Sequence, residues 1–226
     1  MSSGAVDWTG RHVVITGGSS GIGEALAQAV AARGARLTLL ARGADRLAAV
    51  AGPLGATGVP CDVSDRDAVT AVLATAAAER GPVDVLVCSA GITLPSRFLE
   101  AEDQTFRDMV DVDYSGTLWP VRAVAPSMVE RRTGSIIGIA SAAALVGVYG
   151  YTAYGAAKFA VRGLLEALRT ELVPHGVHVG CVYPPDVDTP MLAEEDLVKP
   201  AETKSDAPPA KAGEATVVSL DQFRKK

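Results

Sequence analysis

The stretch HVVITGGSSGIGEALAQAVAAR, residues 12–33, decides the fold of this chain. Its apolar beginning, residues 12–16, predicts a short buried strand, and its alanine-rich end, residues 21–33, predicts a helix. A glycine-rich loop joins the two. A strand, a tight glycine turn and a helix in this order are typical of the first unit of an α/β domain.

The rest of the chain continues the alternation of strands and helices. Further strands are predicted at residues 36–41, 57–62, 83–88, 135–140 and 177–182, and helices at 43–51, 65–80, 105–131 and 151–173. Such alternation requires a parallel sheet with helices on both faces. We therefore predict an α/β fold with a doubly wound, Rossmann-like parallel sheet, in which ligands lie beyond the carboxyl ends of the strands.

The composition limits the class of protein. The chain has 226 residues, 48% of them hydrophobic, which fits one sizeable domain. Its net charge of −5 opposes nucleic-acid binding, and no apolar run is long enough to predict an integral membrane segment. The N-terminus does not resemble a secretory signal. Cys61, Cys88 and Cys181 have neither zinc nor disulfide spacing, so we expect buried thiols in a reducing, cytoplasmic setting.

The glycine-rich loop has the spacing Gly-x-x-x-Gly-x-Gly, a variant of the dinucleotide fingerprint. Glycine lets the backbone approach a pyrophosphate closely, and the helix that follows offers unpaired N–H groups and a positive dipole. A glycine-rich turn without a ligand is the alternative. The residues expected to hold the cofactor phosphates are Gly17, Ser19, Ser20, Gly21, Ile22 and Gly23.

The end of the second strand indicates which dinucleotide is preferred. Residues 39–42 read Leu-Leu-Ala-Arg and hold no carboxylate, while Arg42 can pair with a phosphate. This predicts NADP(H) rather than NAD(H), unless Arg42 is an ordinary surface arginine. At the end of the third strand, Asp62 can accept from an adenine amino group or cap the next helix, although Ser64 or Asp65 is better placed to cap it.

Residues 141–158, SAAALVGVYGYTAYGAAK, contain a candidate catalytic group. Tyr154 and Lys158 are four residues apart, so they share one face of the predicted helix, and the ammonium should lower the pKa of the phenol. Ser141 follows a buried strand and can face the same pocket. A serine that holds a substrate oxygen and a tyrosine that transfers a proton serve carbonyl reduction or alcohol oxidation without a metal. A packed tyrosine beside a solvated lysine is the alternative.

These motifs, in this order, resemble the short-chain dehydrogenase/reductase family over residues 11–203. The resemblance makes Ser141, Tyr154 and Lys158 the catalytic residues, and it places Lys158 on the nicotinamide ribose and Asp62 on the adenine. It also implies a threonine contact with the nicotinamide amide. Further cofactor contacts implied are Val63, Ser89, Ala90, Gly91, Tyr154, Lys158, Pro184, Val187 and Thr189.

Residues 147–203 are similar more narrowly to 3-ketodihydrosphingosine reductases, which reduce a ketone on a long-chain base with NADPH. The resemblance therefore implies an NADP(H)-dependent oxidoreductase acting on an apolar, lipid-like ketone or secondary alcohol. It also implies a homodimer or homotetramer. Met191, Leu192 and Leu197 offer an apolar surface for such a substrate, or simply pack within a helix.

Three departures from the family pattern matter. Asp113 stands where the family has a catalytic asparagine, and a carboxylate accepts hydrogen bonds but does not donate them. It can hold a water or pair with Lys158. Ser89 replaces a second asparagine, and the chain stops where relatives continue. A cofactor-binding sensor or interaction protein with an impaired active site is therefore the alternative function. Nucleotide-sugar enzymes of a related fold have a larger C-terminal domain than this chain offers.

The expected organisation is a single domain with a shortened C-terminus. Residues 1–200 form the dinucleotide-binding oxidoreductase domain, in which residues 184–200 supply the substrate loop. Residues 201–226 are poor in large apolar groups, which predicts a poorly structured tail, with a possible last short strand at 215–220.

Overall fold

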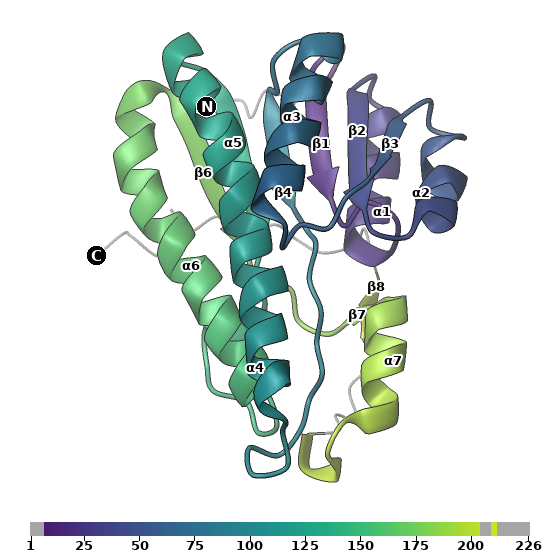
Figure 1. Cartoon of the computed structure of the whole chain (residues 1–226), viewed down its shortest axis with the longest axis vertical. Helices are drawn as coiled ribbons and strands as arrows, with labels where there is room; N and C mark the ends of the chain where they lie inside the picture. The colour runs from purple at the N-terminus through teal and green to yellow at the C-terminus, as the bar shows by residue number, and fades with distance from the viewer. Residues whose placement is uncertain (1–6, 204–208, 212–226) are drawn as a thin grey trace.

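The computed structural model describes residues 7–203 and 209–211 of the chain. Its centre is a six-stranded sheet in the order β3-β2-β1-β4-β5-β6, in which every neighbouring pair is parallel (Figure 1). The predicted doubly wound parallel sheet is therefore confirmed. Its strands are β1 His12–Thr16, β2 Arg36–Ala41, β3 Thr57–Pro60, β4 Val85–Cys88, β5 Gly134–Ile139 and β6 Val177–Val182.

Helices cover both faces of this sheet, as continuous apolar strands require. On one face Val13 and Ile15 of β1 pack with apolar residues of α1 and α2; on the other, Val14 packs with residues of α3, α5 and α6. All residues of β1 are buried as a result. The helices are α1 Gly21–Ala31, α2 Ala44–Ala51, α3 Arg66–Arg80, α4 Asp103–Met109, α5 Gly116–Arg131, α6 Thr152–Leu172 and α7 Pro190–Val198.

The strand order reverses at β1, which places a crevice at the carboxyl edge of the sheet. From β1 the chain goes to β2 on one side, and β4 pairs with β1 on the other. Thr16, the last residue of β1, is in register with Leu40 of β2 and Cys88 of β4. The loops after β1 and β4 therefore meet at this edge, where doubly wound folds bind their ligands.

The long helix predicted at residues 105–131 is not uniform. A π-helical turn, Val110–Ser115, separates α4 from α5, and α5 then continues through two internal prolines, Pro120 and Pro126. Proline has no N–H to donate, so the carbonyls that face these positions are left without that bond. Single π-helical turns inside α-helices are common at functional sites, and this turn carries Asp113.

The segment after β6 forms a small unit beyond the carboxyl ends of the strands (Figure 1). Strand β7, Val187–Asp188, pairs in parallel with β8, Ala210–Lys211. Helix α7 follows β7, with Thr189 as its N-cap and Pro190 at its first position. The strand considered at residues 215–220 lies outside the described residues.

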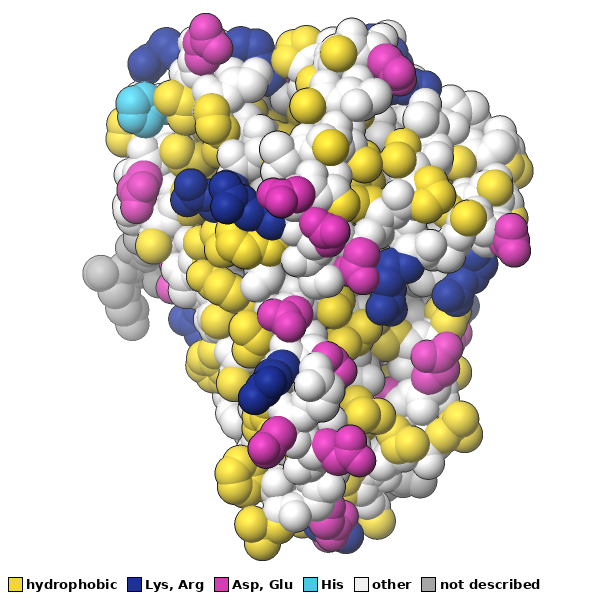
Figure 2. All heavy atoms as spheres, in the orientation of Figure 1, with side chains coloured by type: hydrophobic (Ala, Val, Ile, Leu, Met, Phe, Trp, Pro, Cys, Tyr) yellow, Lys and Arg dark blue, Asp and Glu magenta, His cyan; other side chains and the backbone are white. Residues whose placement is uncertain are grey.

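The surface over α3, α5 and α6 carries both basic and acidic side chains, with apolar side chains between them (Figure 2). Cys61, Cys88 and Cys181 are free and buried, as expected from their spacing. Among the described residues, the helices are all too short or too polar to cross a membrane.

Candidate active site

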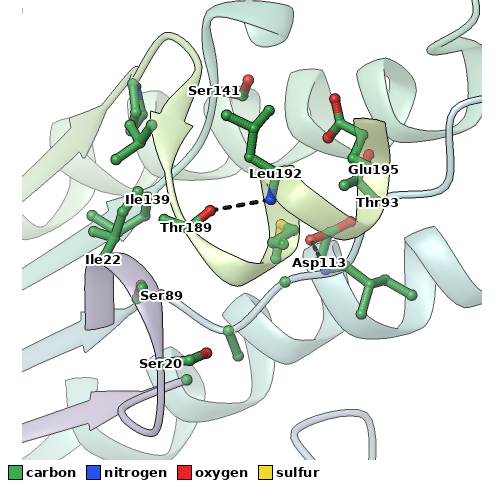
Figure 3. A pocket seen from close by; sticks show the side chains of 18 of the residues that line it. Ser20, Ile22, Ser89, Thr93, Asp113, Ile139, Ser141, Thr189, Leu192 and Glu195 are labelled. Atoms are coloured by element: carbon green, nitrogen blue, oxygen red, sulfur yellow. Dashed lines mark hydrogen bonds between the residues drawn. The ribbon is translucent and has the colours of Figure 1, made fainter. Parts of the chain in front are cut away.

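A cavity of about 800 Å³ opens at the carboxyl edge of the sheet (Figure 3). Its walls come from the glycine loop after β1, the ends of β2 to β5, the start of α6 and the segment from residue 184 to α7. The cavity thus brings together residues that lie far apart in the sequence, and nearly all the predicted site residues line it. Among those, only Gly23, which lies behind the loop, does not line it.

The glycine loop approaches its neighbours more closely than a side chain would allow. Gly17 has a φ of +70°, and a Cβ there would lie 2.7 Å from the backbone nitrogen of Ala90. A Cβ on Gly23 would overlap the carbonyl oxygen of Gly17. Ser20 precedes α1 in an extended conformation and makes no side-chain cap. The first N–H groups of α1 are thus available to an anion, which fits a pyrophosphate.

Two arginines lie at the end of β2. Arg42, predicted from the sequence, and Arg46, which was not predicted, both line the cavity and are exposed. The intervening Asp45 does not line it. Two guanidinium groups from one short segment, whose own carboxylate Asp45 stays outside the wall, fit a phosphate on the cofactor ribose. In the sequence, the Arg-x-x-x-Arg spacing is the feature that could have indicated Arg46 as a second site residue.

Asp62 lines the cavity but does not cap the following helix. Its Oδ1 accepts hydrogen bonds from the backbone nitrogen of Ser64 at 2.9 Å and from the Ser64 hydroxyl at 2.7 Å. These bonds lower the pKa of Asp62. Asp65 is the cap of α3, since it accepts from the backbone nitrogens of Asp67 and Ala68. The predicted adenine contact of Asp62 remains a prediction.

The turn after β4 is held against the glycine loop by Thr16. The backbone nitrogens of Ser89 and Ala90 each donate to the Thr16 hydroxyl at 3.2 Å. Thr16 is fully buried. At Gly91, a Cβ would lie 2.6 Å from Oδ1 of Asp113, so glycine is what allows that carboxylate to approach. The Ser89 side chain is therefore not needed to shape this turn, because the backbone bonds hold it.

Ser141, Tyr154 and Lys158 line the same part of the cavity. Ser141 follows β5, and its Oγ accepts from the backbone nitrogen of Ala143 at 3.1 Å. Tyr154 and Lys158 lie in successive turns of α6, and Lys158 Nζ is 5.4 Å from the centre of the Tyr154 ring. The cavity thus holds a hydroxyl, a phenol and an ammonium in the arrangement that the sequence predicts.

The pKa of Tyr154 is raised rather than lowered. Burial raises it most, while the charge of Lys158 and a hydrogen bond with Ser141 lower it. The expectation of a lowered pKa is therefore wrong in direction, because the effect of burial exceeds that of the lysine. The charges of Asp113 and Glu195 raise the pKa of Tyr154 further.

Asp113 pairs with Lys158, one of the two roles expected for it. Its Oδ1 lies 3.1 Å from Lys158 Nζ and accepts from the backbone nitrogen of Ile92 at 3.2 Å. Asp113 is fully buried, and burial raises its pKa although Lys158 lowers it. Burial lowers the pKa of Lys158, but Asp113 and Tyr154 more than compensate and raise it. Oδ2 of Asp113 is buried without a hydrogen-bond partner in the described part of the chain.

A buried polar network that the sequence analysis missed fixes α7 over the cavity. The Tyr151 hydroxyl donates to Oε1 of Glu195, and Lys199 Nζ lies 2.9 Å from the same oxygen. All three side chains are at least nine-tenths buried. Glu195 and Lys199 are four residues apart, which predicts an ion pair on a helix. Tyr151 comes from the start of α6, so its contact could be found only in three dimensions.

The substrate-loop residues divide between the cavity and the surface. Pro184, Val187, Thr189, Met191 and Leu192 line the cavity, whereas Leu197 is 85% exposed and does not line it. The expected contribution of Leu197 to an apolar substrate surface is therefore wrong. Thr189 Oγ1 accepts from the backbone nitrogen of Leu192 at 3.2 Å (Figure 3). Its hydroxyl proton remains available, and the predicted nicotinamide contact remains a prediction.

Comparisons with known proteins agree with this geometry. The family described as short chain dehydrogenase matches residues 11–199. The chain is 43% identical over 205 residues to the 3-dehydrosphinganine reductase of Danio rerio and 42% identical over 205 residues to the 3-ketodihydrosphingosine reductase of Mus musculus. Each match covers 86% of this chain and 62% of the relative.

The fold is also similar to that of a solved structure. The crystal structure of levodione reductase superposes with a TM-score of 0.86 at 25% identity, covering 97% of this chain and 94% of that one. The chain spans only 62% of the length of the two sphingoid-base relatives. Motif order, sheet topology and these matches together establish that the chain belongs to the short-chain dehydrogenase/reductase family of oxidoreductases.

Proposed function

We propose that this protein is an NADP(H)-dependent oxidoreductase that reduces a ketone or oxidises the corresponding secondary alcohol. The observation that carries the proposal is the meeting of Ser141, Tyr154 and Lys158 in one cavity with the glycine loop. A general acid, a hydrogen-bond donor for the substrate oxygen and a dinucleotide cradle are the parts that this reaction needs.

The residues have distinct roles in this reaction. A bound nicotinamide supplies or accepts the hydride. Ser141 accepts from Ala143, so its own proton can be directed to a substrate oxygen. Tyr154 donates a proton to that oxygen during reduction and takes it back during oxidation. The ammonium of Lys158 stabilises the phenolate. It would also hold the ribose hydroxyls of a bound cofactor.

The proposed preference for NADP(H) over NAD(H) is supported by the two arginines of the cavity wall, Arg42 and Arg46. The proposed substrate is a long-chain 3-keto lipid such as 3-ketodihydrosphingosine. The names of the relatives support it, as does the apolar surface that Met191 and Leu192 give to the cavity. The cytoplasmic location and the homodimer or homotetramer stay predictions.

A second function is favoured by one observation. Asp113 holds Lys158 at 3.1 Å, and this pairing opposes the effect of the lysine on Tyr154. A protein with this site could bind NADP(H) without turnover and serve as a sensor or interaction protein. The intact Ser141, Tyr154 and Lys158 make catalysis the leading proposal.

NADPH oxidation with a panel of ketones, including 3-ketodihydrosphingosine, tests the proposal. The experiment compares the unmodified protein with Tyr154→Phe, and with Tyr183→Phe as a matched control outside the cavity. Turnover that only Tyr154→Phe abolishes is the expected result, with NADPH binding retained in both variants. Tight NADPH binding without turnover of any ketone would instead support the sensor.

A further inference from the structure

The wall of the cavity formed by residues 186–199 is acidic. Asp186, Glu194 and Glu195 line the cavity there, and Lys199 is the one basic side chain of the cavity wall in this segment of the described chain. Asp196 adds a fourth carboxylate behind the wall, 3.2 Å from Lys199 Nζ. An apolar uncharged ketone does not require such a wall, since carboxylates are costly to desolvate.

Glu195 is the carboxylate of this wall that can bind a ligand. It is only 8% exposed, and Figure 3 shows it on α7 among the residues around the pocket. Tyr151 and Lys199 both contact its Oε1. Within the described residues its contacts run through Oε1, so Oε2 retains its lone pairs for a donor in the cavity. A buried carboxylate that keeps one oxygen toward a cavity favours a ligand with a cationic or N–H donor.

The same wall already holds a primary ammonium. Lys199 Nζ lies 2.9 Å from Glu195 and 3.7 Å from Asp186, and its side chain is 4% exposed. Asp186, Glu194 and Glu195 all line the wall, so three carboxylates there stand against this single ammonium. The charge of the wall is therefore not neutralised by Lys199, and a second ammonium would be attracted.

Glu195 is also close to the chemistry. Tyr151, its hydrogen-bond partner, precedes Tyr154 by one turn, and their ring centres are 5.9 Å apart. The charge of Glu195 acts on the hydroxyl of Tyr154 and raises its pKa. A cation bound at Glu195 would thus sit near the oxygen that Tyr154 protonates.

We propose that Glu195 binds the protonated amine of an amino-ketone substrate, so that the neighbouring carbonyl lies between Ser141 and Tyr154. This inference rests on the proposed reductase function, and it adds the residue that would recognise the amine of such a substrate. Glu195 supplies specificity for the amine, while Ser141, Tyr154 and Lys158 act on the ketone.

The test compares a long-chain 2-amino-3-ketone with its N-acetyl derivative, which has no positive charge. The unmodified protein should prefer the amine in kcat/KM, and Glu195→Gln should reduce that preference by about 10-fold or more, the loss expected for a charge-assisted hydrogen bond. Glutamine keeps the shape and can still accept from Tyr151. Asp196→Asn is the matched control, because it removes a carboxylate near Lys199 that does not line the cavity; the preference should remain.

Three outcomes would overturn the inference. The first is a reductase that turns over both ketones equally, which leaves the proposed function intact. The second is that Glu195→Gln lowers kcat/KM equally for both ketones and that Tyr151→Phe does the same. Glu195 would then serve only to hold α7 in place. The third is read without turnover: the NADPH-loaded protein is titrated with a long-chain 2-amino alcohol and with its N-acetyl derivative. Equal affinity for the two would reject the amine site even if no ketone is reduced.

Discussion

The substitution Asp113→Asn tests how a buried carboxylate controls the acid strength of Tyr154. Lys158 Nζ lies 5.4 Å from the ring centre of Tyr154. At an effective dielectric constant of about 20, the attraction between this ammonium and a phenolate at that distance is roughly 3 kcal/mol, or about two pKa units, in favour of the phenolate. Asp113, 3.1 Å from Lys158 Nζ, opposes that effect. Removing its charge should therefore lower the pKa of Tyr154 by about one unit.

The assay is the pH dependence of kcat/KM for ketone reduction and for oxidation of the matching alcohol. Reduction needs the protonated phenol, so its rate falls as the pH rises through the pKa of Tyr154. Oxidation needs the phenolate, so its rate rises through the same pKa. In Asp113→Asn, the fall of the reduction rate and the rise of the oxidation rate should both move to lower pH. Alcohol oxidation at a fixed pH below the pKa should increase about tenfold for a shift of one unit.

Asp111→Asn is the control, since Asp111 is an exposed carboxylate of the same π-helical turn. Breaking a buried ion pair can cost about 3 to 5 kcal/mol, so the melting temperature of each variant must be measured first. The Asn oxygen can still accept from Lys158, which limits that loss. If the folded Asp113→Asn variant has unchanged pH profiles for reduction and oxidation, or profiles moved to higher pH, the electrostatic reasoning is refuted.

Two further predictions concern the cofactor and the fold. Arg42→Ala should weaken NADPH binding by about 10-fold and leave NADH binding unchanged, because the lost interaction is with the additional phosphate. Fluorescence titration with each cofactor measures both affinities. Equal losses of affinity for NADPH and NADH would contradict the prediction. Asp65→Ala should lower the free energy of unfolding by about 1 kcal/mol through loss of the α3 N-cap; urea denaturation measures it, and an unchanged midpoint would show that solvent replaces the cap.

The sheet could be predicted from the sequence because its strands are covered on both faces. Burial on both faces produces short continuous apolar runs, and β1 is buried along its whole length. The ends of the strands were less certain: β3 ends at Pro60 rather than residue 62, and β4 begins at Val85 rather than residue 83. End positions depend on local hydrogen bonds, which apolar patterning does not report.

The π-helical turn at Val110–Ser115 could not be predicted, because it has no hydrophobic period of its own. Tertiary packing selects it: Asp113 meets Lys158 of α6 and the backbone of Ile92. The identity of Asp113 was visible in the sequence, and its pairing with Lys158 was one of two expected roles. Only the three-dimensional arrangement shows this pairing.

The contact of Tyr151 with Glu195 likewise depends on the position of α7. Residues 151 and 195 come from separate elements, and no sequence period relates them. The Glu195 and Lys199 spacing was visible, but a helical ion pair on the surface has the same spacing. Burial is what distinguishes a wall of the cavity from a solvated face, and burial of α7 is set by the rest of the fold.

The charges around Tyr154 bear on the direction of the reaction. Burial raises its pKa, and Asp113 and Glu195 add to the rise, while Lys158 and Ser141 oppose it. A raised pKa favours the protonated phenol, which is the form that donates to a ketone. A substrate ammonium at Glu195 would offset one of the two negative charges. In the proposed reaction, such a substrate would therefore make the proton of Tyr154 easier to donate when the ketone is in place.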